Sequence, residues 1–170
     1  MADLLNTNSN ATNYGDDAIV TLSPREHIRL RPGMYVGVVG DGSQPDEALY
    51  VLIKEVVDNS IDEFIMGAGR QIDITLADNV VTVRDYGRGI PLKSLAAAVG
   101  QMNTGGKYGG DAFKKTVGLN GVGVKAVNML SEEFTARSVR DGEARTVTFA
   151  KGLEVSDRWE SGVLSLIHIS

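Results

Sequence analysis

The sequence predicts an α+β fold, a two-layer α/β sandwich in which helices cover one face of a mostly antiparallel sheet. Two patterns carry this prediction. Short apolar segments joined by turn residues predict β-hairpins at about residues 71–84 and 133–150. Apolar residues at three- and four-residue spacing predict helices at about 46–66, 92–102 and 121–131.

The two hairpins are defined by their turns. In the first, the segment Ile72 to Leu76 pairs with a strand that contains Val80, Val81 and Val83, through the turn Ala77-Asp78-Asn79. The second hairpin turns at Asp141-Gly142, a dipeptide typical of tight two-residue turns. A further short helix is expected at about residues 24–31.

The length of 170 residues suits a single domain. We expect a flexible arm at residues 1–18, which reads as a disordered terminal tail, and a domain at 19–160. A hydrophobic content of 42% is enough to form a core. The helices and strands therefore belong to one packed unit.

Composition excludes several classes of protein. There is no cysteine, hence no disulfide framework or thiol chemistry, and no stretch predicts a membrane span or a signal peptide. The net charge of -5 does not suit a general nucleic-acid binder. These properties are typical of a cytoplasmic enzyme module, in which any contact with DNA would come from a local basic patch or from regions beyond this chain.

The segment from Leu49 to Ile65 places two kinds of chemistry on one helix. One face carries the apolar residues Leu49, Leu52, Ile53, Val56, Val57, Ile61, Phe64 and Ile65. The opposite stripe carries Glu55, Asp58, Asn59 and Asp62. Glu55 suits a general base and Asn59 a neutral oxygen ligand for Mg²⁺. The alternative is a surface helix with an acidic face.

A second segment, Val81 to Pro91, reads as a strand that ends in an acid and a flexible turn. Asp85 could accept a hydrogen bond from an exocyclic amine such as that of adenine. Gly87 and Gly89 would let the backbone approach a ligand closely. The alternative, a strand followed by a glycine-rich turn with a capping Asp, is equally compatible with this segment alone.

A third segment, Asn103 to Leu130, is glycine-dense and then becomes helical at about Val122. Glycine amides that lead into a helix N-terminus form phosphate sites, and the segment also carries four lysines. Its spacing, Gly118-x-x-Gly121-x-Gly123, matches neither the Rossmann fingerprint nor a P-loop. The alternative is a mobile linker, which rarely turns so abruptly into an apolar helix.

Together these motifs resemble the nucleotide-binding fold shared by DNA gyrase, heat-shock chaperone ATPases, histidine kinases and MutL. The resemblance is closest to the B subunits of bacterial type IIA topoisomerases, gyrase and topoisomerase IV, and covers about residues 14–150. It rests on RPGMYVG (Arg31 to Gly37), EVVDNSIDE (Glu55 to Glu63), DYGRGIP (Asp85 to Pro91), TGGKY (Thr104 to Tyr108) and GLNGVGVKAVN (Gly118 to Asn128).

The resemblance implies a role for each matching residue. Glu55 corresponds to the general base for ATP hydrolysis, Asn59 to the Mg²⁺ ligand, and Asp85 to the acid that reads the adenine amino group. The resemblance implies that Gly89, Ile90 and Pro91 line the adenine pocket, and that Lys107 and the amides from Gly118 to Gly123 belong to a lid that closes over the phosphates. The further nucleotide-binding residues that the resemblance implies are Asp62, Gly89, Ile90, Pro91, Lys107, Gly118, Leu119, Asn120, Gly121, Val122 and Gly123.

The resemblance also implies partners. Arg88 and Arg140 flank the mouth of the pocket, where aminocoumarin-type inhibitors bind in the family. Tyr14 and Ile19 match arm residues that reach the nucleotide site of the other protomer when ATP closes a homodimer. A topoisomerase A subunit and DNA would bind through regions that this chain lacks. Tyr86 and Asn120 depart from common residues of the family, and Asn120 with Lys125 favours a topoisomerase IV-like protein.

The expected function is an ATP-binding and ATP-hydrolysing module that drives ATP-gated closure of a topoisomerase dimer. An alternative is a nucleotide-binding regulator or kinase on the same fold. A histidine kinase needs a phosphoacceptor helix, and His27 has no such setting. A third interpretation is a structural α/β module that happens to be rich in glycine.

The C-terminal end departs from the family pattern. In the family, further strands follow residue 150, one of them with a phosphate-contacting threonine, so we expect the domain to be C-terminally truncated. Residues 164–170 read LSLIHIS, which resembles the translation of a transposon-end adapter used in sequencing libraries. We expect this tail to be non-native; the alternative is a genuine apolar strand end.

Overall fold

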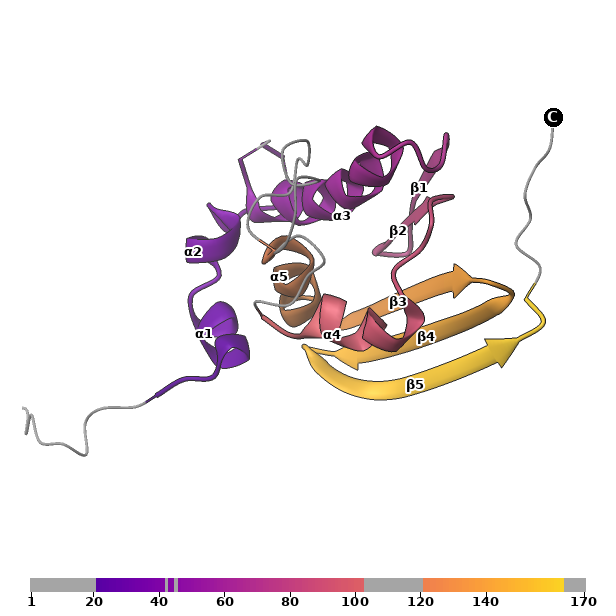
Figure 1. The fold of residues 1–170 in the computed structure, drawn as a ribbon. Coiled ribbons are helices and arrows are strands. Elements are labelled where there is room, and N and C mark those ends of the chain that lie inside the picture. Colours follow the sequence, from indigo (N-terminus) through magenta and orange to yellow (C-terminus); the bar gives the residue numbers. More distant parts are fainter. Residues whose placement is uncertain (1–20, 42, 45, 103–120, 164–170) are drawn as a thin grey trace, which may run out of the picture.

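The computed structural model describes residues 21–41, 43–44, 46–102 and 121–163 (Figure 1). It begins with α1 (Pro24–Leu30), which matches the expected short helix. A capping box starts this helix: the Glu26 amide donates to Ser23 Oγ (3.3 Å), and the Ser23 amide donates to the Glu26 carboxylate (2.9 Å). The short helix α2 (Gly33–Val36) follows, and then the long helix α3 (Ala48–Ile65).

Both predicted hairpins are confirmed. β1 (Ile72–Ala77) pairs antiparallel with β2 (Val80–Asp85), and β3 (Glu133–Arg140) pairs antiparallel with β4 (Glu143–Ala150). Both central residues of each turn have positive φ, at Asp78 (50°) and Asn79 (62°), and at Asp141 (53°) and Gly142 (80°). Asn, Asp and Gly tolerate this conformation, which is why these residues in the sequence predict tight turns.

A third strand of the second sheet, β5 (Leu153–Ser161), was not predicted. It pairs antiparallel with β4 after a turn at Lys151 (φ 50°) and Gly152 (φ 82°), with a register irregularity at Thr148/Phe149. Its sequence, LEVSDRWES, carries acidic and polar residues at most positions and lacks a continuous apolar alternation. Pairing with β4, rather than an intrinsic pattern, makes this segment a strand.

The described strands form two sheets, β1-β2 and β3-β4-β5, where one continuous layer was expected. After β2 the chain runs through a glycine-rich turn into the 3-10 helix η2 (Leu92–Ser94) and α4 (Leu95–Gly100). This turn meets β3 through a side chain: Ser138 Oγ donates to the carbonyl of Ile90 (2.7 Å). The contact joins the hairpin β1-β2 to the second sheet without a backbone ladder.

Helices α4 and α5 (Gly123–Leu130) lie beside the three-stranded sheet, with α3 beyond α5 (Figure 1). One core cluster joins α4 to β4 through Leu95, Val99, Val147 and Phe149. A second joins α2, α3 and α5 through Val36, Ala48 and Ala126. The α+β class with helices packed on antiparallel strands is therefore confirmed.

Helix α3 differs from the amphipathic prediction. Its polar residues Asp58, Ser60 and Asp62 are buried, whereas the apolar residues Phe64 and Ile65 at its end are exposed. The helix contacts α2, α5 and β2, so packing on several sides overrides the simple two-faced pattern. Lys54 forms an ion pair with Asp58 one turn later. Across the described part of the chain, no helix combines the length and apolarity that a membrane crossing requires.

Candidate nucleotide site

The first side chains of the site lie on α3. Glu55 and Asn59 are one helical turn apart, and the Asn59 side-chain amide Nδ2 donates to the Glu55 backbone carbonyl (2.7 Å). Because the nitrogen is directed at the helix backbone, the Asn59 Oδ1 atom is directed away from it. An exposed amide oxygen held in this orientation is a suitable ligand for a hard cation.

The Glu55 carboxylate lies directly against the start of α5. A Cβ atom built on Gly123, the first residue of α5, would lie 1.7 Å from Glu55 Oε2. The first-turn amides of a helix have no intrahelical acceptors and carry partial positive charge. Glu55 and the glycine-led helix start, which were predicted from separate motifs, are therefore neighbours in the fold.

Asp85 ends β2 with its carboxylate held by two donors. The Gly87 amide donates to Asp85 Oδ1 (2.9 Å), and Ser60 Oγ on α3 donates to Oδ2 (3.4 Å). Both oxygens keep free lone pairs, so the group can still accept a hydrogen bond from a ligand amine. Asp85 and Ser60 line a hollow of about 220 Å³ between the end of α3 and β1.

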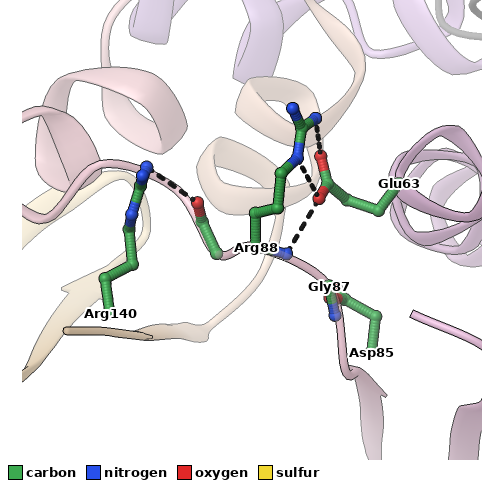
Figure 2. A network of polar contacts seen from close by, with 6 residues as sticks. Glu63, Asp85, Gly87, Arg88 and Arg140 are labelled. Carbon is green, nitrogen blue, oxygen red and sulfur yellow. Dashed lines mark hydrogen bonds and ion pairs between the residues drawn. The ribbon is translucent and has the colours of Figure 1, made fainter. Parts of the chain in front are cut away.

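An ion pair fixes the turn after Asp85 (Figure 2). Glu63, near the end of α3, accepts from the Arg88 amide (3.0 Å), from Arg88 Nε (3.1 Å) and from a terminal guanidinium nitrogen (2.8 Å). The hydrogen bonds from Arg88 lower the pKa of Glu63 and raise the pKa of Arg88. Bonding to both the backbone and the side chain makes Glu63 an anchor for the turn.

Sequence reasoning did not single out Glu63 as a site residue. Glu63 lies one turn after Asn59 on α3, and this spacing was the available signal. Its partner, however, is 25 positions away, in a different motif. A pairing at that separation depends on the tertiary fold and has no signature in the local pattern.

Strand β3 supports the other side of the turn. Gly89 has a φ of 72°, and a Cβ there would lie 2.8 Å from Ser138 Oγ, so glycine is required by conformation and by space. Arg140 donates to the Gly89 carbonyl (3.4 Å), as Figure 2 shows. The predicted mouth residues Arg88 and Arg140 thus flank the turn from opposite sides.

Several predicted residues are placed less directly. Asp62 is buried within α3, with 6% of its surface exposed. Gly89 and Ile90 are held by Arg140 and Ser138 of β3, and neither they nor Pro91 line the hollow beside Asp85. Gly121 (φ 60°) and Val122 lead into α5. The predicted site residues outside the described part of the chain are Tyr14, Ile19, Lys107, Gly118, Leu119 and Asn120.

Tyr86, one of the departures from the family pattern, is held on the hairpin. Its hydroxyl donates to Asp73 Oδ2 on β1 (2.7 Å), and the Arg84 guanidinium lies 4.6 Å from the centre of its ring. The Asp73 bond raises the pKa of Tyr86. Tyr86 therefore packs along β1 and β2 while the preceding Asp85 reaches Ser60.

A metal would depend on few protein ligands. Among the described residues, no three His, Cys, Asp or Glu side chains converge in a way that could hold an ion. The oriented oxygen of Asn59 nevertheless fits Mg²⁺, which often takes one or two protein ligands and completes its shell with water and substrate phosphates. The donor set suits a metal that arrives with a nucleotide.

Comparison with known proteins connects this geometry to a family. Residues 44–154 match the family described as Histidine kinase-, DNA gyrase B-, and HSP90-like ATPase. The chain is 55% identical to the B subunit of DNA topoisomerase 4 from Borreliella burgdorferi over 146 residues, which are 86% of this chain and 24% of that protein. It is 42% identical to the B subunit of DNA gyrase from Rickettsia conorii over 153 residues, which are 85% of this chain and 18% of that protein.

A solved structure is similar as well. The chain superposes with a TM-score of 0.65 and 27% identity on the 43K ATPase domain of Thermus thermophilus gyrase B, a complex with an aminocoumarin, covering 82% of this chain and 35% of that one. The chain spans about a quarter or less of the length of the two curated relatives above. The match over residues 44–154 includes Glu55, Asn59, Asp85 and Gly123, and the chain belongs to the histidine kinase-, DNA gyrase B- and HSP90-like ATPase family.

Proposed function

We propose that the chain is the ATP-binding and ATP-hydrolysing module of a type IIA topoisomerase B subunit. The observation that supports this most strongly is the convergence of three predicted groups. Glu55 and Asn59 lie one turn apart on α3, and the Glu55 carboxylate lies against the start of α5. This arrangement suits a nucleotide whose phosphates reach the amides of α5 while a base stands beside them.

In the proposed reaction each residue acts at a defined atom. Asp85 accepts a hydrogen bond from the adenine amino group, and the α5 amides bind phosphate oxygens. Asn59 Oδ1 would hold Mg²⁺, which when bound would offset the charge of the phosphates. Glu55 takes a proton from water as the water oxygen bonds to the terminal phosphorus, and the bond to the bridging oxygen breaks to release ADP.

The proposed partners follow from the relatives. As a B subunit, the chain would dimerise on binding ATP through an arm that includes Tyr14 and Ile19, and would act with an A subunit on DNA. The residues of the nucleotide site that belong to the predicted lid, Lys107 and Gly118 to Gly123, would close over the phosphates. An aminocoumarin is present in the similar Thermus structure. Such inhibitors are expected to bind beside Arg88 and Arg140.

Two measurements test the proposal. Titration of the chain with ATP and Mg²⁺, with GTP as the comparison, should show binding that prefers adenine. A structural module without nucleotide chemistry would bind neither. A longer form, joined to the downstream regions of the Borreliella relative, should hydrolyse ATP faster when DNA is added. Hydrolysis that DNA does not stimulate, together with phosphate transfer to protein, would instead support a kinase of the same family.

A further inference from the structure

Gly123 is a glycine that the backbone does not require. It is the first residue of α5, and its φ lies outside the left-handed region, so other residues can adopt its conformation. Glycine is also a poorer helix former than alanine. The reason for glycine at this position must therefore lie in the space around it.

That space is filled by Glu55. A Cβ on Gly123 would lie 1.7 Å from Oε2, 2.5 Å from Cδ and 3.0 Å from Cγ of Glu55, and the first two distances are far inside van der Waals contact. Gly33, the first residue of α2, provides the contrast, because a Cβ there would have no atom within 4 Å. Gly33 and Gly123 thus both stand first in their helices, but only at Gly123 would a side chain overlap another residue.

The packing of α3 on α5 sets this contact. Ala48 on α3 and Ala126 on α5 share a core cluster, so the two helix backbones are held at a fixed distance. The carboxylate of Glu55 extends from α3 to the end of α5 that carries partial positive charge, where an anion is stabilised. Glu55 can take this place only if the first residue of α5 has no side chain.

We propose that Gly123 is a positioning residue for Glu55: its missing side chain leaves the volume that the Glu55 carboxylate occupies at the start of α5. The inference rests on the proposed function in one respect, since there Glu55 is the general base. A larger residue at position 123 displaces the carboxylate and not the helix, because the clashing atoms are the far end of a flexible side chain.

The test compares Gly123→Ala with Gly33→Ala in chains labelled with ¹³C at the glutamate side-chain carboxyls. The Glu55 resonance is identified by its loss in Glu55→Gln. In Gly123→Ala the melting temperature should stay within about 4 °C of the parent chain, the range that a change near 1 kcal/mol produces at this size. The Glu55 resonance should move while the other glutamate resonances stay. In Gly33→Ala the Glu55 resonance should not move.

An unmoved Glu55 resonance in folded Gly123→Ala would overturn the proposal. If Gly123→Ala melts well below the parent chain, the double variant Gly123→Ala/Glu55→Ala should recover the lost melting temperature, and failure to recover it would also overturn the proposal. Titration with ATP and Mg²⁺ tests the proposed function separately from the role of Gly123. Parent chain that binds no nucleotide would count against the proposed function, while the resonance comparison would still decide the role of Gly123.

Discussion

At the residue scale, the polar groups of the site are held by neighbours that leave their reactive atoms accessible. Asn59 uses its nitrogen on the helix backbone and keeps its oxygen. Asp85 accepts from Gly87 and Ser60, which fixes the carboxylate as an acceptor. Because these groups are held in place, replacing one oxygen of such a side chain by an NH₂ group should alter ligand recognition without disturbing the fold.

Asp85→Asn should weaken ATP binding about tenfold to a hundredfold. The new amide can present its NH₂ to the adenine amino group, so that two donors face each other. An unpaired polar group buried under the ligand costs about 1–3 kcal/mol. Calorimetric titration with ATP and Mg²⁺ measures the loss. Asp141→Asn, in the β3–β4 turn, is the matched control and should bind as the parent chain does. Parent-like affinity in folded Asp85→Asn would remove Asp85 from the adenine site.

Glu55→Ala should separate binding from hydrolysis. A general base contributes roughly 10²–10⁴ in rate, whereas Asp85, the α5 amides and Mg²⁺ on Asn59 should hold the ground-state nucleotide. In a form of the chain that hydrolyses ATP, turnover should fall by that factor while the dissociation constant for ATP changes little. Glu132→Ala, a change at an exposed side chain that pairs with Lys151, should affect neither. An equal loss of binding and turnover would make Glu55 a structural residue.

At the element scale, a few long side chains join segments that the sequence presents as independent. Arg145 on β4 donates to the carbonyls of Leu92 (2.7 Å) and Lys93 (3.1 Å) on η2. It also forms a two-bond pair with Asp157 on β5 (2.9 and 2.8 Å) and lies 5.0 Å from the centre of the Trp159 ring. The Arg145 guanidinium thus links β5 and η2 to β4, the central strand of the sheet.

Arg145→Lys should destabilise the fold by roughly 1–3 kcal/mol, because an ammonium cannot reproduce the planar two-bond contact and would leave carbonyls of η2 unpaired. Chemical denaturation measures this difference in the free energy of unfolding. Arg137→Lys is the control, since the Arg137–Glu160 pair on the other face is more exposed and should change stability by less than about 1 kcal/mol. Equal effects of the two changes would contradict the role of Arg145.

The Glu63–Arg88 pair should make the stability of the site turn depend on pH. Arg88 lowers the folded-state pKa of Glu63 below its ordinary value of 4.5. The stabilisation is therefore complete above that value and is lost as the pH falls through the lower folded-state pKa. Glu63→Gln should lower stability by about 0.2–1 kcal/mol at pH 7, with a difference that shrinks below pH 4.5. Melting curves across pH, with Glu143→Gln as an exposed control, test this; a constant difference down to pH 3 would contradict it.

Local chemistry accounts for what the sequence predicted at this scale. The hairpins followed from Asp78-Asn79 and Asp141-Gly142, which tolerate positive φ in isolation. β5 was missed because its strand character comes from β4. The burial of Asp58 and Asp62 was not foreseen, since helical periodicity assumes that α3 has one buried face. The Glu63–Arg88 anchor depends on a contact across 25 positions, which local patterns do not contain.

At the scale of the whole molecule, considerable apolar surface is exposed. Leu153, Val155 and Trp159 on β5 are each about half exposed or more, and the outer edge of β5 has no strand partner among the described residues. Ile74, Leu76 and Val80 on the hairpin β1-β2 are exposed as well. An open edge beside apolar side chains presents unpaired backbone groups to other chains.

We therefore expect the 170-residue chain to be marginally stable and to self-associate as its concentration rises. Val155→Lys should reduce this association, because a charge on an edge strand opposes pairing with a second strand. Val155→Thr keeps the β-branched shape without the charge and should associate more than the lysine variant. Sedimentation velocity over a range of concentrations distinguishes them. A chain that stays monomeric throughout, or two variants that associate equally, would show that the β5 edge is not the surface through which the chain associates.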